Sequence, residues 1–182
     1  MGPTEEIVRS TEELARASNN LGFRLLSLLL PQDPGPNVLI SSFSVALALA
    51  MTYNGAERKT KQALAEILGL RNIKAEDLNA ASKALMSIGQ GLVPGVQLHV
   101  ANSIWVRRGV QPAPEFVQSI EDAYDGEFAS VDLADPATAE VINDWVARKT
   151  HDLIDQLVTP RLIKLAVLIL INAIAFKGIW TH

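Results

Sequence analysis

One apolar segment near the start of the chain limits what the rest of it can fold into. Between Phe43 and Met51 almost every residue is apolar, and a serine cluster at Ser41, Ser42 and Ser44 precedes this run. Serine oxygens accept hydrogen bonds from the free N–H groups at a helix start, so we predict a helix capped by this cluster. A helix without a polar side lies inside a large core, and this one is too short to cross a bilayer. The other elements must therefore supply enough apolar surface to cover it.

The organising region as a whole extends over Asn37–Leu70. Val38–Ile40, before the serines, has residues typical of a strand, and Gly55 after the helix predicts a left-handed C-terminal residue. Thr60 predicts the cap of a second helix, which Gly69 would end. We therefore expect a short strand and two consecutive helices here.

Two amphipathic helices are predicted on either side of this region. Ser10 and Glu13 have the spacing of a capping box, which predicts a helix start. The apolar stripe behind it is formed by Leu14, Ala17, Leu21, Leu25 and Leu28. Ala75–Gln90 predicts a surface helix by the same periodicity. Its apolar side is formed by Leu78, Ala81, Leu85 and Ile88.

Two long strands are predicted further along the chain. Val96–Arg107 alternates between apolar and other residues, with Asn102 as the polar exception on the apolar side and His99 on the side that we expect to face solvent. Ala166–Phe176 is continuously apolar except for Asn172. This composition predicts a strand covered on both faces, near the middle of a sheet, and a buried helix is the alternative.

Shorter elements are predicted between these strands. Pro114 would begin a helix that Gly126 ends, and Glu127–Asp132 is a candidate short strand. Asp135 followed by Pro136 predicts the start of another helix. The apolar stripe of that helix is formed by Val141, Ile142, Trp145 and Val146. The segment 150–164, which contains a proline, is expected to be irregular.

Composition excludes several classes of protein. The 182 residues are 48% hydrophobic and 20% charged, which is typical of a globular protein, and the net charge of −4 gives no basic surface for nucleic acid. No apolar run reaches the length of a membrane span, and the polar start MGPTEEIVRS leads us to expect no signal peptide. The chain has no cysteine, which excludes disulfides, zinc–thiolate sites and thiol catalysis within it.

Catalytic and metal-binding motifs are missing from the sequence. There is no GxSxG, HExxH, P-loop or GxGxxG pattern. The histidines, which lack metal-ligand spacing, are His99, His151 and His182. The acidic residues that resemble a solvated helix end are Glu121, Asp122 and Asp125. We therefore expect no enzyme activity, no metal and no cofactor.

Polar residues in apolar surroundings are the more informative feature. They are Ser41, Ser44, Asn102 and Asn172. A buried asparagine without partners costs about 1–3 kcal/mol, so each should belong to a hydrogen-bond network. Such a network is either a structural link or a switch point at which strands part, and these residues alone leave both interpretations open.

Four motifs carry a resemblance to the serpin family. Asn37-x-x-x-Ser41-Ser42-Phe43-Ser44, with Gly55-Ala56 and Thr60 downstream, resembles the N-terminal signature of serpins. Ala101–Val106 is similar to their second strand of sheet A, and Ile142–Val146 with Thr150 to their helix F. Ile171–Trp180 resembles the third strand of sheet A and the turn after it. The motifs occur in family order from about residue 14 onward, so the chain is identified as a member of this family.

The sequence departs from the family pattern at a few positions. Ser42 stands where serpins usually have proline, and Arg58 where they often have a second glycine. Ala175 replaces the usual tyrosine, and Asp152 with Leu153 replaces a Gly-Lys pair. None of these changes removes an element, so they indicate divergence within the family.

The resemblance implies a fold and an extent. The expected class is α+β and serpin-like, with N-terminal helices packed on a mixed sheet A and a buried central helix. Residues 1–182 would form the N-terminal portion of a single serpin domain. The fold would be incomplete as given, because serpins are roughly twice this long. The missing portion would contain the reactive-centre loop, the fifth strand of sheet A and most of sheets B and C.

The resemblance also implies a function for the complete form, namely inhibition of serine-type endopeptidases by a suicide-substrate mechanism in which the cleaved loop inserts into sheet A. Ser41, Ser44 and Asn172 would belong to the shutter beneath the opening strands, and Lys177 and Trp180 to the breach where insertion starts. Partners would be serine proteases, with cysteine proteases as a second class, bound through the missing loop. No nucleic acid or membrane partner is expected, whereas strand-mediated oligomers are.

Alternatives to this function follow from the same resemblance. The protein could be a non-inhibitory serpin-like binding protein, carrier or chaperone, or the chain could be a fragment without inhibitory activity. Hinge residues in the missing half would separate these cases, since small alternating residues favour insertion. Family resemblance implies an extracellular location, and a cytoplasmic one is the alternative because neither a signal peptide nor cysteine is visible.

Overall fold

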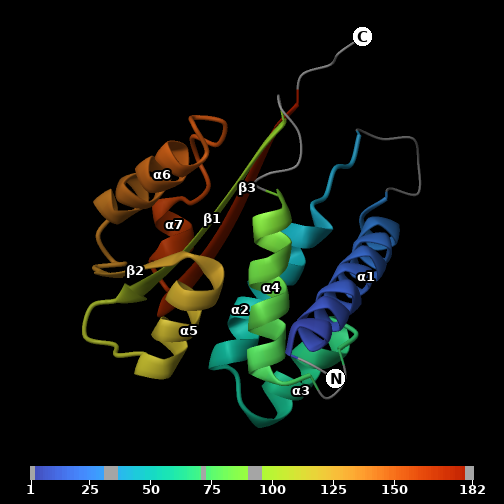
Figure 1. Ribbon diagram of the computed structural model, residues 1–182. Helices are drawn as coiled ribbons and strands as arrows, with labels where there is room; N and C mark the ends of the chain where they lie inside the picture. Colours follow the sequence, from blue (N-terminus) through green and yellow to red (C-terminus); the bar gives the residue numbers. More distant parts are fainter. Residues whose placement is uncertain (1–2, 31–36, 71–72, 90–95, 179–182) are drawn as a thin grey trace. The chain divides into compact units, whose positions relative to one another are not determined.

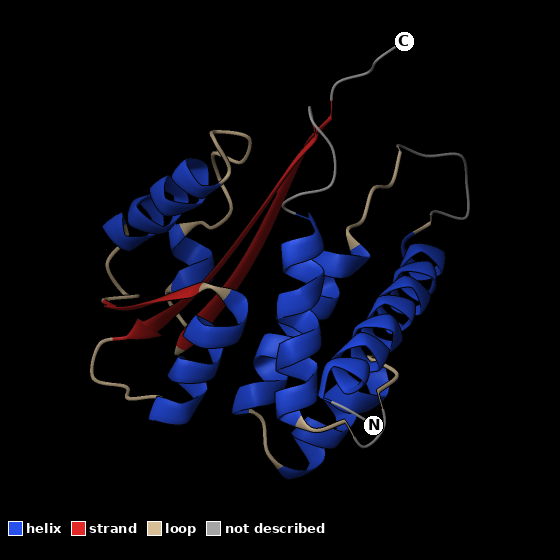
Figure 2. Ribbon diagram, viewed as in Figure 1, coloured by secondary structure: helices blue, strands red, loops and turns tan. Residues whose placement is uncertain are grey.

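The computed structural model describes residues 3–30, 37–70, 73–89 and 96–178. Contacts divide the chain into two compact units, residues 1–85 (unit 1) and 86–182 (unit 2). Figures 1 and 2 show the helices and strands of each unit. In chain order the elements are α1 (Pro3–Leu29), α2 (Ser42–Gly55), α3 (Arg58–Ile67), α4 (Ala75–Gly89), β1 (Val96–Arg107), α5 (Pro114–Tyr124), β2 (Gly126–Val131), α6 (Ala137–Lys149), α7 (Pro160–Ile163) and β3 (Leu168–Gly178).

Helix α2 is the buried element of unit 1, as its sequence predicted. No side chain from Ser42 to Met51 is exposed, and α1 packs along it. The two helices approach closely at Gly22, where an added Cβ would lie only 2.6 Å from the Cβ of Ser42. The core residues that surround α2 in this unit include Leu14, Leu21, Leu64, Leu68 and Leu78.

Polar links fasten α2 to the residues that follow it in unit 1. The side-chain amides of Asn54 and Asn79 bond to each other in both directions, at 2.8 and 2.9 Å, and so connect α2 to α4. The Tyr53 hydroxyl donates to the carbonyl of Ile73 at 2.9 Å. These bonds satisfy polar groups beside the apolar helix. Without them, these groups would lose their hydrogen bonds to water on burial and gain no others.

Several predicted boundaries in unit 1 are wrong. Helix α1 begins at Pro3, so Ser10 lies inside it and is buried instead of forming a capping box. Val38–Ile40 has no strand partner in the described chain. Gly55 ends α2 without a positive φ, and Thr60 lies inside α3, whose N-cap is Glu57. These sequence signals are local, whereas helix boundaries also depend on packing.

Other predictions in unit 1 hold only in part. Ser41 caps α2, and Gly69 adopts φ +68 just after α3. In α1 the stripe is buried up to Leu21, but Leu28 is 81% exposed. Ile88, near the end of α4, is also exposed, at 54%. The apolar periodicity therefore located these helices correctly but overestimated how far their buried sides extend.

Unit 2 contains a mixed three-stranded sheet in the order β2–β1–β3, with β1 in the middle (Figure 1). β1 pairs with β2 in parallel, and helix α5 forms the crossover connection between them. β1 pairs with β3 in the antiparallel direction. Val96–Arg107 is a strand over its whole predicted length. β3 is also a strand, so the helix alternative for Ala166–Phe176 is wrong. Only one face of β3 is well buried, and β3 lies at an edge of the described sheet instead of near its middle.

The two faces of the sheet carry different helices. Odd-numbered residues of β1, such as Ala101 and Trp105, belong to a core with α6, and the Trp105 ring meets that of Trp145 edge to face with centroids 6.1 Å apart. The even-numbered Asn102 instead bonds to the end of α5. Because successive side chains of a strand point to opposite faces, α6 and α5 cover opposite sides of the sheet.

Three details of unit 2 differ from the sequence predictions. Asp125, with φ +50, forms the left-handed end of α5, and Gly126 already belongs to β2. Val141 is 51% exposed on α6, so the buried side of this helix includes Thr138 and Ala139 instead. The segment between α6 and β3 is irregular as predicted, apart from the single turn of α7.

Candidate functional site

Two asparagines form a hydrogen-bonded pair where the three strands of the sheet lie side by side. Asn102 of β1 is opposite Asn172 of β3 on one side and Gly126 of β2 on the other. The Asn172 amide donates to Asn102 Oδ1 at 2.7 Å, and the Asn102 amide donates to the Tyr124 carbonyl at 2.7 Å. Asn102 is only 2% exposed. The pair therefore links β3, β1 and the end of α5 in one buried network.

Gly126 makes room for this network. A Cβ at this position would lie 2.5 Å from Ile120 Cγ2 and 3.2 Å from the Ile120 carbonyl oxygen. Only glycine lets β2 start this close to α5. The Tyr124 carbonyl, two residues earlier, is thereby within reach of the Asn102 amide.

Ser41 and Ser44 lie in unit 1, at the start of α2. The Ser41 Oγ accepts a hydrogen bond from the Ser44 backbone N–H at 3.2 Å, so Ser41 is the N-cap that the sequence predicted. Ser41 is exposed and Ser44 is half-buried. The structure brings these two serines together, and separately brings Asn102 and Asn172 together within unit 2.

The predicted breach residues lie near the C-terminal end of β3. Lys177 is exposed and is opposite Gln97 on β1. Five residues separate it from Asn172, which corresponds to about 17 Å along a strand. Trp180 lies outside the described residues.

His99 is not solvent-facing, contrary to the sequence prediction. Its ring packs against that of His151 with centroids 4.2 Å apart, and its Nε2 is buried without a hydrogen-bond partner. His151 follows α6 in the chain. α6 and the residues after it cover this face of the sheet. His99, which the alternation of β1 predicted to face solvent, is therefore half-buried.

A second polar cluster fastens α6 to β2. Glu127 of β2 accepts a hydrogen bond from Trp145 Nε1 at 2.8 Å and forms an ion pair with Lys149. The Lys149 bond, followed by the Trp145 bond, holds the pKa of Glu127 below its ordinary value of 4.5, against the opposing effect of burial. The apolar stripe of α6 predicts only a packing role for Trp145, and nothing in the local pattern connects it to Glu127.

Asn143 and Arg107 hold the irregular segment between α6 and β3. Asn143 Oδ1 accepts from the backbone N–H groups of Leu157 and Val158, both at 2.9 Å, and its amide donates back to the Val158 carbonyl. Arg107 donates to the carbonyls of Lys164 and Ala166 at 2.7–3.0 Å. Sequence reasoning missed both roles. Asn143, a polar residue beside the buried Ile142, was the available signal.

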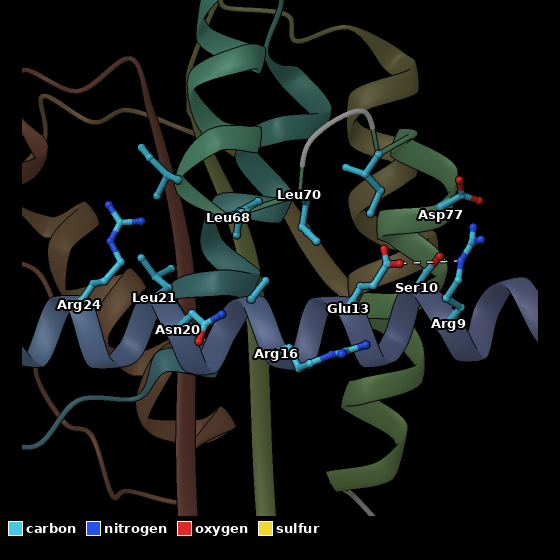
Figure 3. A pocket seen from close by; sticks show the side chains of 14 residues that line it. Arg9, Ser10, Glu13, Arg16, Asn20, Leu21, Arg24, Leu68, Leu70 and Asp77 are labelled. Carbon is cyan, nitrogen blue, oxygen red and sulfur yellow. Dashed lines mark ion pairs between the residues drawn. The ribbon is translucent and has the colours of Figure 1, made fainter.

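Unit 1 contains a depression (Figure 3). It has a volume of about 710 Å³ and lies between α1, the end of α3 and α4. Arg9, Arg16 and Arg24 line it along α1, and Figure 3 shows the Arg9–Glu13 ion pair, with an N–O distance of 3.8 Å. Its leucines and mixed charges form no nucleophile–base arrangement.

The chemistry available in the described residues is that of hydrogen bonding between strands and helices. In that part of the chain no group of three or more His, Cys, Asp or Glu side chains could hold a metal ion. None of its helices is long and apolar enough to cross a membrane. The Asn102–Asn172 pair is the candidate site, because it is a buried polar link between the two long strands β1 and β3.

Comparison with known proteins gives the family. A family model described as "Serpin (serine protease inhibitor)" matches residues 16–182. The chain belongs to the serpin family. Glia-derived nexin from Mus musculus is a relative with 33% identity over 177 residues, which cover 94% of this chain and 42% of the nexin. Iripin-2 from Ixodes ricinus is 34% identical over 173 residues, 92% of this chain and 43% of the iripin.

A solved serpin structure shows the same fold. The structure titled "Cleaved Serpin 42Da" matches 94% of this chain and 45% of its own length, with a TM-score of 0.78 and 33% identity. The serpin-like α+β class with a mixed sheet is thus confirmed, and the fold is incomplete relative to full serpins. This chain spans less than half the length of the serpins with which it is compared.

Proposed function

We propose that this chain is the N-terminal portion of a single serpin domain whose complete form inhibits serine proteases. Family membership supports this proposal. The observation that carries it is the position of β3, which pairs with β1 along one edge and has no strand on its other edge among the described residues. An open edge of this kind accepts an added strand.

The proposed mechanism uses that edge. The serine oxygen of the target protease attacks a carbonyl of the reactive-centre loop, an ester forms, and the amine of the cleaved peptide bond leaves. The free loop then inserts beside β3 and carries the acyl-enzyme with it, which distorts the protease before water can hydrolyse the ester. The nucleophile belongs to the target, so the serpin itself is not an enzyme.

Site residues have separate roles in this proposal. Ser41, Ser44 and Asn172 form the shutter, in which hydrogen bonds hold the strands until insertion begins. The 2.7 Å bond between Asn172 and the buried Asn102 supports this role for Asn172. Lys177 and Trp180 form the breach, where the first residues of the loop enter. The exposed position of Lys177 near the end of β3 is compatible with that role.

The test uses the intact protein from its natural source and begins with its mass. A mass near twice 19.7 kDa leaves room for a reactive loop, whereas 19.7 kDa would rule out loop insertion in this chain alone. The intact protein is then incubated with trypsin-like, chymotrypsin-like and subtilisin-like proteases. We expect an SDS-resistant complex with one of them, and a higher thermal midpoint once the loop is cleaved. Cleavage without a complex and without a gain in midpoint would support a non-inhibitory binding protein or chaperone instead.

The class of target protease, the location of the protein and its oligomeric state each have a separate test. We propose serine proteases as partners, with cysteine proteases as the second class, and a papain-like enzyme in the same assay separates the two. An extracellular location predicts the intact protein in culture medium, whereas recovery from the cytoplasm alone contradicts it. Strand-mediated oligomers through the β3 edge predict that the isolated 182-residue chain elutes from a sizing column as species larger than the monomer, and a purely monomeric elution contradicts them.

A further inference from the structure

A groove lies beside β2, the strand at the edge of the sheet opposite β3. It has a volume of about 800 Å³ and is formed by the loop 109–112, one side of α5 and the strand β2. Val110 and Phe128 line it and are each 38% exposed. Pro112, Pro114 and Val117 extend this apolar lining. A partner could therefore bury apolar side chains here without any rearrangement of the core.

β2 itself offers backbone hydrogen bonds next to this groove. It is an edge strand, paired only with β1 in the described sheet. The Val131 carbonyl accepts from Arg108 N, so the backbone of Val131 points toward the sheet. Backbone groups alternate in direction along a strand, and the N–H and C=O groups of Phe128 and Ser130 therefore point outward. Both residues also line the groove, which places an open backbone edge and an apolar surface side by side.

The segment that contains this edge is strongly acidic, although the exposed Arg108 directly precedes it and Arg148 directly follows it. Residues 109–147 contain nine Asp or Glu and no Lys, Arg or His. The whole chain has 16 basic and 20 acidic side chains, so the residues outside 109–147 carry 16 basic and 11 acidic ones. Their net charge is +5, whereas the net charge of residues 109–147 is −9. All nine carboxylates are exposed, and Glu121 and Asp122 line the groove itself. Lys149 forms an ion pair with one of the nine, Glu127.

We propose that the β2 edge is a docking site for an extended, basic segment of another protein, in which Lys or Arg alternates with apolar residues. The segment adds a strand to β2 through the outward backbone groups of Phe128 and Ser130. Its apolar side chains enter the groove, and its basic side chains face the surrounding carboxylates, which also attract it over a distance. This surface is separate from the β3 edge, so the proposal does not depend on protease inhibition.

A binding experiment tests the charge and the strand addition together. The probe is a fluorescein-labelled octapeptide of alternating Arg and Val, titrated against the intact protein and followed by fluorescence anisotropy. We expect binding that weakens at least about fivefold when the ionic strength rises from about 0.05 to 0.2 M, because the Debye length shortens. The matched Glu/Val octapeptide should not bind. Equal binding of both peptides, or no binding of either, would overturn the proposal.

Variants separate the backbone and charge contributions. Ser130→Pro removes an outward N–H without breaking a bond to β1, so it should weaken binding at least about tenfold, whereas Ser130→Ala should bind as the parent does. Glu121→Lys should weaken binding about fivefold or more, and the same charge change at exposed Glu12 of unit 1 should have less effect. Parent-like binding by both Ser130→Pro and Glu121→Lys would contradict the proposal. If Ser130→Pro fails to fold, amide exchange decides, since bound peptide should slow exchange at Phe128 and Ser130.

Discussion

Replacement of Asn172 by leucine tests the buried asparagine pair most directly. The Asn172 amide donates to Asn102 Oδ1 at 2.7 Å, and Asn102 is 2% exposed. Leucine has a similar branched shape but is larger and lacks the donor, which leaves a buried acceptor without this bond. The expected cost is about 1–3 kcal/mol of unfolding free energy. Asn172 is only half-buried, so the added apolar surface returns little of this loss.

The measurement is a thermal melt of the intact protein followed by circular dichroism. For a domain of about 150–250 residues each kcal/mol lowers the midpoint by about 2–4 °C, and the shift is smaller for the larger complete domain. The matched control is Asn19→Leu, the same chemical change at an exposed position of α1, where an effect within about 0.5 kcal/mol is expected. A sizing column should also show oligomers of Asn172→Leu if loss of this bond loosens β3 beside its open edge.

A double-mutant cycle with Asn102→Leu completes this test. Groups that share a hydrogen bond show interaction energies of about 0.5–3 kcal/mol, so the double variant should cost less than the sum of the two single variants. It should still be less stable than the parent, because Asn102 also donates to the Tyr124 carbonyl. An Asn172→Leu protein that melts like Asn19→Leu, and stays monomeric, would refute the reasoning.

Three other perturbations have outcomes fixed by local geometry. Arg58→Gly should stabilise by about 0.5–1 kcal/mol in urea unfolding, because φ is +48 at this position and only glycine adopts it without strain; an unchanged urea midpoint would contradict this. Gly126→Ala should destabilise by about 1–3 kcal/mol, since its Cβ would meet Ile120 Cγ2 at 2.5 Å, and Ile120→Ala, which removes this methyl group, should cost less in the Gly126→Ala background than alone. The pKa of Glu127 is lowered in the fold, so its stabilisation is present above about pH 4.5 and is lost as the pH falls through the lower folded value. Glu127→Gln should therefore reduce the difference in stability between pH 7 and pH 3.5, and an equal difference would disprove the role of its Lys149 and Trp145 bonds.

Long periodic segments were predictable from the sequence because their signal is repeated at every residue. β1 extends over the predicted Val96–Arg107, and β3 is shifted by only two residues from the prediction Ala166–Phe176. Helix starts were less predictable. Ser41 caps α2, but Ser10, an equally good capping residue by type, lies buried inside α1. The difference lies in tertiary packing, which a capping pattern of four residues does not contain.

The candidate site was predictable only as a set of residues. Asn102 and Asn172 were singled out as polar positions in apolar strands, and the antiparallel register makes them direct neighbours. The second partner of Asn102, the Tyr124 carbonyl, is a backbone group, so no residue type in the sequence indicates it. His99 was misplaced for a related reason. Its exposure depends on residues after α6, about 50 positions away, that strand alternation does not describe.

The departures from the family pattern gain a physical meaning in the structure. The resemblance to serpins led us to expect glycine at or near Arg58 and Asp152, and the φ angles of these residues are +48 and +59. His151, next to Asp152, also has a positive φ of +52. A left-handed conformation costs a non-glycine residue about 1–2 kcal/mol, so other interactions in the fold must offset this cost at each position. The fold, more than the local residue preference, therefore determines the backbone conformation at these two turns.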